Sequence, residues 1–221
     1  MKRLVKIIAV CTAAVLSAAV LPASLKATTP EEILEQMDKA LDNADTKGAY
    51  FVMEMKMPIL GTIPAKIWSL GEKTRMETGA GDKDIIIWYD KETHWEYNIS
   101  KNEITIKNNK KDEEESSEKS KSEEGMGMFE DMDEGYDMIL EKETATEWHI
   151  LFKKSKSNKE KDDPKKMNLI VSKTTNLPIS LKASLKGVTM TIRDVAVGGF
   201  TEDFVTFHPG DYPNAKIIDT R

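Results

Sequence analysis

The chain has 221 residues, 39% hydrophobic and 32% charged, a composition that suits one domain with a buried core. Its formal net charge of −6 argues against a nucleic-acid partner, because phosphate binding needs clustered lysine and arginine. Its single cysteine, Cys11, excludes a disulfide framework.

The first residues are typical of a secretory signal peptide. A basic start, Met1–Lys6, precedes the apolar run Ile7–Leu21, and Ala27 is a suitable last residue before cleavage. The alternative is a retained anchor, but the run is shorter than the roughly 20 apolar residues of a spanning helix. We therefore expect residues 1–27 to be removed, residues 28–221 to form a single domain, and the mature, cysteine-free protein to lie in a bacterial periplasm.

A helix is predicted to open the mature chain. Thr29 can cap it, Pro30 suits the first helical position, and Glu32 completes a capping box. Apolar residues then follow at helical spacing as far as Ala44, which predicts about four turns, and Asp45–Gly48 is the expected end.

After this helix the hydrophobic period changes from 3.6 to 2. Alternating segments such as 51–57 and 188–192 recur along the chain and predict roughly ten strands. We expect an antiparallel sheet with one covered face and one wet face. Hairpin connections are expected at 90–93, 100–102, 172–178 and 185–187.

Two segments interrupt the alternation. Residues 107–124 are almost wholly charged or serine, so we expect a disordered loop, with an acidic binding tract as the alternative. Residues 153–166 are also charged and predict a long hairpin tip. Between them, 125–140 is rich in methionine and suits a short helix or lid followed by a strand.

No pattern in the sequence indicates an enzyme. His94, His149 and His208 are scattered, and none has a second ligand at metal-binding spacing. Neither a nucleophile motif nor a phosphate loop is present, so we expect no catalytic residue, no metal and no cofactor. His94 and His149 alternate with Trp95 and Trp148, which favours a solvated sheet face for both.

The methionines are more informative. Met53, Met55 and Met57 share one face of a strand, and methionine is over-used where a surface accepts variable apolar shapes. The alternatives are an ordinary core and a copper site, but strand positions i, i+2 and i+4 spread over about 13 Å and do not converge on one ion. One helix and one methionine-rich segment are thin cover for such a sheet, which predicts an apolar cavity.

The order of motifs resembles the LolA-like family of periplasmic lipoprotein carriers, especially forms from Bacteroidetes. The resemblance lies in "AKIWSLGEKTRMET" (65–78), the aromatic hairpin "IIIWYDKETHWEYNISKNEITI" (85–106), the segment 168–195, and the ending "DFVTFHPGDYPNAKIIDTR" (203–221). It covers the chain from about residue 30 to 221 apart from the charged loop.

The resemblance implies a strongly curved antiparallel half-barrel covered by the N-terminal helix and the short methionine-rich segment. It also implies a monomer that shields acyl chains of lipoproteins or other lipids, taking them from an inner-membrane release complex to an outer-membrane acceptor. The alternative is a non-carrier member that binds a protein partner or senses the state of the envelope. Carriers of the best-studied type have an Arg-Pro pair where this chain has Leu70-Gly71, and the nearest basic residues are Lys73 and Arg75.

These expectations name two groups of residues. The candidates for the cavity wall are Phe51, Met53, Met55, Met57, Trp68, Met76, Ile87, Trp95, Tyr97, Ile104, Leu140, Trp148, Ile150, Met190 and Ile192. The candidates for the lid are Ile33, Leu34, Met37, Leu41, Met126, Met128, Phe129 and Met132. Alternation places Trp95 and Tyr97 on one face and His94 on the other, which predicts that the hairpin packs and that His94 faces solvent. Whether Trp88 or Trp95 faces a ligand stays open.

Overall fold

The computed structural model describes residues 28–79, 84–109, 129 and 132–221. The predicted signal peptide, the lid candidates Met126 and Met128 and most of the predicted charged loop lie outside these ranges. Lys107 and Asn108 belong to a strand, so the charged loop begins later than its composition predicted. Both residues are held by antiparallel pairing, Lys107 with His94 and Asn108 with Thr93.

The N-terminal helix forms as its sequence predicts and then ends early. Helix α1 (Pro30–Leu41) begins with a complete capping box, in which the Thr29 hydroxyl accepts from Glu32 N at 3.2 Å and Glu32 Oε2 accepts from Thr29 N at 3.1 Å. The prediction of one helix to Ala44 is wrong: a turn at Asp42 separates α1 from the short α2 (Ala44–Lys47). The turn still buries Ala44 beside the apolar stripe of α1.

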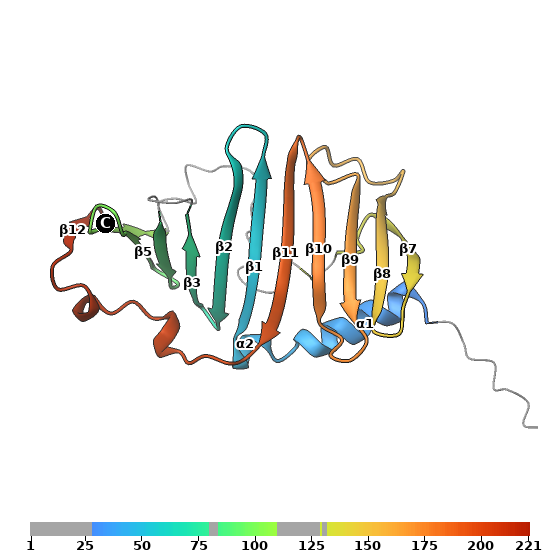
Figure 1. Cartoon of the computed structure of the whole chain (residues 1–221), viewed down its shortest axis with the longest axis horizontal. Coiled ribbons are helices and arrows are strands. Elements are labelled where there is room, and N and C mark those ends of the chain that lie inside the picture. Colours follow the sequence, from blue (N-terminus) through green and yellow to red (C-terminus); the bar gives the residue numbers. More distant parts are fainter. Residues whose placement is uncertain (1–27, 80–83, 110–128, 130–131) are drawn as a thin grey trace, which may run out of the picture.

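Twelve strands form one open, curved sheet, the half-barrel that was predicted (Figure 1). Its order is β12-β6-β5-β4-β3-β2-β1-β11-β10-β9-β8-β7, and every pair is antiparallel except β12 with β6. The strands are β1 (Ala49–Met57), β2 (Gly61–Leu70), β3 (Lys73–Thr78), β4 (Ile85–Tyr89), β5 (Thr93–Asn98), β6 (Glu103–Asn108), β7 (Tyr136–Glu143), β8 (Glu147–Lys154), β9 (Lys166–Ser172), β10 (Pro178–Leu185), β11 (Val188–Val197) and β12 (Lys216–Asp219).

One face of the sheet, which we call the helix face, carries the main core. Because cross-strand partners share a face, the register defines a row of side chains across it. The row contains Leu140, Ile150, Leu169, Leu181, Ile192, Met53 and Ala65. Helix α1 packs on this row through Ile33, Leu34, Met37 and Leu41, all buried. Helices α1 and α2 together therefore cover this face, with α1 reaching β7 and α2 lying beside β2 (Figure 1).

The other face, which we call the C-terminal face, has an aromatic row of its own. Here the register aligns Tyr50, Trp68, Arg75, Trp88, Trp95 and Ile106 from β1 to β6. The segment from Gly198 to Ala215, with the 3-10 turns η3 (Asp203–Val205) and η4 (Pro209–Asp211), crosses these strands (Figure 1). Strand β12 then adds to the edge strand β6. The sheet is therefore covered on both faces, over two sets of strands that overlap at β1 and β2.

The connections follow the sequence prediction. Residues 90–92, 99–102, 173–177 and 186–187 join consecutive strands, and residues 155–165 form the long β8–β9 connection. None of the helices in the described ranges has the length and apolar character to cross a bilayer.

Candidate functional site

The cavity-wall candidates divide between the two faces of the sheet. Most lie on the helix face, where strand register aligns them with the core row: Phe51, Met53, Met55, Met57, Met76, Ile87, Leu140, Trp148, Ile150, Met190 and Ile192. Several of these are packed within the core rather than beside open space. Phe51, Ile150 and Ile192 are at most 1% exposed.

The remaining four candidates, Trp68, Trp95, Tyr97 and Ile104, lie on the C-terminal face. The β1–β2 register pairs Trp68 with Tyr50 rather than with Met53 or Phe51. The β4–β5 pairing of Trp88 with Trp95 places both indoles on this same face. The expectation of a single apolar wall is therefore corrected: these four side chains pack under the C-terminal segment, away from α1.

The helix face contains a cavity of about 810 Å³ at one end of the sheet. This volume lies within the range of about 300–1,000 Å³ that is usual for ligand pockets. Its apolar floor comes from β9, β10, β11 and the segment before β7, and consists of Met132, Met167, Leu181, Ala183 and Met190. Three of these are methionines, whose unbranched side chains adapt to different apolar shapes. We call this space the methionine cavity.

A polar rim surrounds the mouth of the methionine cavity. It is formed by Glu134, Gly135 and residues 157–160 and 163–164 of the β8–β9 connection. Tyr136 joins rim and floor, because its ring contacts Phe152 and its hydroxyl donates to Pro164 O at 3.0 Å. Burial, with a further contribution from Asp163, raises the pKa of the Tyr136 hydroxyl, which therefore stays a neutral donor at physiological pH.

The β8–β9 connection holds its shape through specific contacts. Asn158 Nδ2 donates to Asp163 Oδ2 at 2.7 Å, and Ser155 N donates to Gly135 O at 3.0 Å. Gly135 has a φ of +77°, and a Cβ atom there would lie 2.6 Å from Asn158 Nδ2. Glycine at 135 thus permits the close approach of the connection that shapes the mouth.

The lid candidates that the structure describes all lie in the helix-face core. Ile33, Leu34, Met37 and Leu41 of α1 pack there together with Phe129 and Met132. Met132 also lines the methionine cavity, so it is the point where the predicted methionine-rich cover meets the open space.

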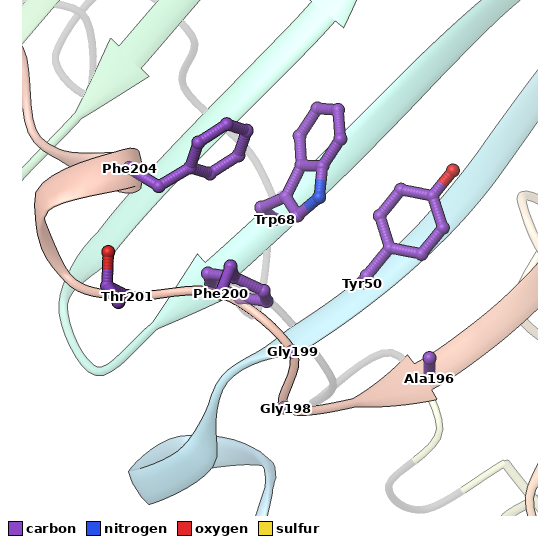
Figure 2. Close-up of a pocket in the computed structure, with 8 residues that line it drawn as sticks. All are labelled: Tyr50, Trp68, Ala196, Gly198, Gly199, Phe200, Thr201 and Phe204. Carbon is purple, nitrogen blue, oxygen red and sulfur yellow. The ribbon is translucent and has the colours of Figure 1, made fainter.

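A second, aromatic pocket of about 460 Å³ lies on the C-terminal face (Figure 2). Tyr50 and Trp68 project from β1 and β2 with their ring centroids 5.1 Å apart, and Phe204 meets Trp68 edge-on at 5.2 Å. Phe200 closes the pocket from the C-terminal segment. Burial, reinforced by Asp194, raises the pKa of the Tyr50 hydroxyl. The pocket offers aromatic rings and a neutral hydroxyl rather than a charged group.

The three histidines lie apart from both pockets. His149 Nε2 lies 3.0 Å from Glu147 Oε2, and His208 Nε2 lies 2.9 Å from Asp203 Oδ1. His94 is half-buried and its ring centroid is 4.7 Å from that of Tyr89, so it is less solvated than predicted. Among the described residues, no three His, Cys, Asp or Glu side chains gather in a group that could hold a metal ion.

Sequence reasoning missed most of the residues that line the methionine cavity. Of the two candidate groups, Met190 and Met132 line it, whereas Tyr136, Met167, Leu181 and Ala183 were not predicted. Leu181 and Ala183 belong to a clearly alternating segment, and the pairing of Ala183 with Met190 places them side by side. If the strands on either side of the turn at 185–187 are paired as a hairpin, Ala183 lies opposite Met190, so this register would have indicated that the two residues share a site.

No family model matches the chain, and no curated protein matches it either. Among solved structures, an uncharacterized conserved protein from Thermus thermophilus is 16% identical, covers 86% of this chain and 98% of its own, and has a TM-score of 0.47. A LolA superfamily protein from Nitrosomonas europaea is 13% identical, with coverages of 82% and 99% and a TM-score of 0.33.

A putative outer membrane lipoprotein-sorting protein domain from Vibrio parahaemolyticus is also similar, at 11% identity, coverages of 80% and 97%, and a TM-score of 0.35. The solved structures that are similar to this chain thus include members of the family that its motifs resemble. Identities of 11–16% and TM-scores below 0.5 do not carry an activity from one protein to another.

Proposed function

We propose that this chain is a non-enzymatic carrier, which shields an acyl chain of a lipoprotein or another lipid in the methionine cavity. The observation that carries the proposal is the combination of a cavity of about 810 Å³, an apolar floor with three methionines, and a polar mouth. An acyl chain fits the floor, and its polar headgroup stays at the rim formed by the β8–β9 connection.

The energetics of transfer favour such a site. Each methylene removed from water contributes about 0.8 kcal/mol, so an unshielded acyl chain leaves a membrane slowly. A carrier has to replace that contribution and yet release the chain. Methionine side chains suit this task because their contacts are apolar but adjust to the ligand. Loading from an inner-membrane complex and release to an outer-membrane acceptor across the periplasm complete the proposed route.

Native mass spectrometry of protein purified from cell envelopes without detergent tests the proposal. We expect a fraction of the protein to carry additional mass that corresponds to an acylated lipid, and to bind a fluorescent fatty acid after delipidation. Protein that carries no lipid and binds no fatty acid would contradict the proposal.

The aromatic pocket favours a second candidate function, the binding of a protein partner in the envelope. The aromatic side chains of this pocket are half-buried, and Trp, Tyr and Phe are enriched at protein interfaces. A photo-reactive residue placed at the exposed Thr201, on the pocket wall, would crosslink such a partner. Trp68→Ala is expected to abolish the crosslink without changing fatty-acid binding. Loss of both together would refute a separate partner site.

A further inference from the structure

Two large apolar side chains project from the turn between β1 and β2. Ile59 is 95% exposed and Leu60 is 68% exposed, the highest values among the exposed large hydrophobic residues of the described chain. Tight turns usually carry Gly, Asn, Asp or Ser, which water solvates well. Adjacent Ile and Leu at such a tip are unfavourable in water, and they indicate that the tip meets an apolar medium.

The tip stands on a regular hairpin and close to a second one. Strands β1 and β2 pair without interruption up to Met57 and Gly61. Pro58, which starts the turn, lies 3.6 Å from the position of a Cβ atom on Gly187, in the β10–β11 turn. Lys186 of that turn forms an ion pair with Asp162 of the β8–β9 connection. Three connections therefore share one end of the sheet, at the top of Figure 1.

The β8–β9 connection at this end of the sheet, with the strand ends that flank it, is basic in a chain that is acidic as a whole. Residues 153–166 contain seven lysines and three acids, against a formal net charge of −6 for the chain. The opposite end carries α1 and α2, where residues 30–47 contain six acids and two lysines (Figure 1). Lysines beside an exposed apolar tip complement a bilayer with anionic headgroups, which attracts basic segments to its surface.

An apolar track joins this tip to the methionine cavity. Met53, Met55 and Met57 follow one another on the helix face of β1 and are half-buried. Met55 pairs across the strands with Met190, which lines the cavity. The residues after Met57 are the tip itself. Cavity, track and tip are thus continuous in the direction of the basic end.

We propose that the β1–β2 tip inserts Ile59 and Leu60 into a bilayer bearing anionic phospholipids, while the lysines of residues 153–166 contact its headgroups. Docked in this way, the protein presents the mouth of the methionine cavity to the membrane. This docking would bring the proposed carrier to the membrane where it takes up or releases its lipid, and in that sense it rests on the proposed function.

Flotation with lipid vesicles tests the docking. Purified protein is mixed with vesicles of phosphatidylcholine alone, or of phosphatidylcholine and phosphatidylglycerol in equal parts. We expect binding to the anionic vesicles that falls with added salt, and a decrease of about ten-fold or more in the double variant Ile59→Ser with Leu60→Ser. Ile217→Ser is the matched control, because Ile217 is 55% exposed but lies on β12, and it is expected to bind as the parent does.

Fatty-acid binding without vesicles separates this inference from the carrier function. The double variant is expected to retain it, because Ile59 and Leu60 do not line the methionine cavity. Absence of fatty-acid binding in the parent would refute the carrier function. Equal vesicle binding by the parent and the double variant would refute the insertion of the β1–β2 tip into the bilayer. Equal binding to neutral and anionic vesicles would also refute it. If sedimentation shows that the parent is a dimer and the double variant a monomer, the tip binds a second copy of the chain rather than a bilayer. This outcome would overturn the proposal.

Discussion

The ring of Phe200 lies so close to Gly48 that a Cβ atom at residue 48 would come within 2.5 Å of the ring carbon Cζ. Gly48 also has a φ of +87°, a conformation that other residues adopt only with strain. Gly48→Ala is therefore expected to lower the free energy of unfolding by about 2–3 kcal/mol in urea denaturation. Gly61→Ala, with a φ of +79° and nothing within 4 Å, is expected to cost less. Equal losses would mean that the Phe200 ring moves freely.

Arg75 is expected to fasten the C-terminal segment to the sheet. Its guanidinium carbon lies 4.4 Å from the centroid of Phe204, and Nη1 donates to Phe204 O at 3.4 Å. Arg75→Met should lower the free energy of unfolding by about 1–3 kcal/mol and speed amide hydrogen exchange in η3. Arg193→Met, at an exposed pair with Glu54, is the control and is expected to leave the stability nearly unchanged. Unchanged exchange in η3 would rule out this role for Arg75.

Thr29 is expected to stabilise α1 through its capping box. Thr29→Ala removes the acceptor for Glu32 N, and the typical cost of such a change is about 1 kcal/mol. Thr29→Ser keeps the hydroxyl and should retain most of the stability. Thermal unfolding followed by circular dichroism measures both variants. A Thr29→Ser protein as unstable as Thr29→Ala would show that the methyl group, and not the cap, matters.

Stability is expected to fall at alkaline pH. Burial raises the pKa of the Tyr212 hydroxyl above its ordinary value of 10.0, with Arg75 opposing the shift and Asp211 adding to it. The folded state therefore holds this proton more tightly than the unfolded state. The contribution is complete below pH 10.0 and is lost as pH rises through the folded pKa. Urea denaturation between neutral pH and about pH 11 should show the decline, and Tyr212→Phe should make it shallower. An identical decline in both proteins would exclude Tyr212 as a source.

Filling the methionine cavity is expected to block lipid binding. Ala183 lines the cavity, and Ser184 is the next residue on the opposite face of β10. Ala183→Phe should lower fatty-acid affinity about ten-fold or more, because the ring takes the space of several methylenes. Ser184→Phe places the same ring outside the cavity and should bind as the parent does. A cavity variant that binds fatty acid normally would move the ligand site elsewhere.

Local patterns predicted the elements of this fold well. The capping box at Thr29 and Glu32 and the alternation of Trp95 with His94 depend on near neighbours in sequence, so both are confirmed. The early end of α1 was missed because Ala44 continues the apolar stripe even though the chain turns at Asp42. The hydrophobic periodicity thus extends further along the sequence than the helix does.

The division of the candidate wall between two faces was beyond such patterns. Met53 and Trp68 both lie in apolar alternating strands, and their relative side depends on how β1 and β2 pair. Trp68 is covered by Phe204, which lies 136 residues further along the chain. Contacts at this separation are not visible in the hydrophobic period of either strand. The helix face nevertheless contains an apolar space, and the carrier function stays a prediction that rests on it.

The parallel pairing of β12 with β6 has a consequence for assembly. An unpaired edge strand is a template for another chain, and at this end of the sheet β12 covers β6 and becomes the edge strand in its place. In the described chain, the other end of the strand order is β7, with Asp137, Glu141 and Glu143 along it. The edge at the β6 end is therefore β12, a strand of only four residues that offers little template to another chain, and the acidic side chains of β7 oppose pairing of the other edge with a second copy. In the described chain, both edges of the sheet thus disfavour pairing with a second copy.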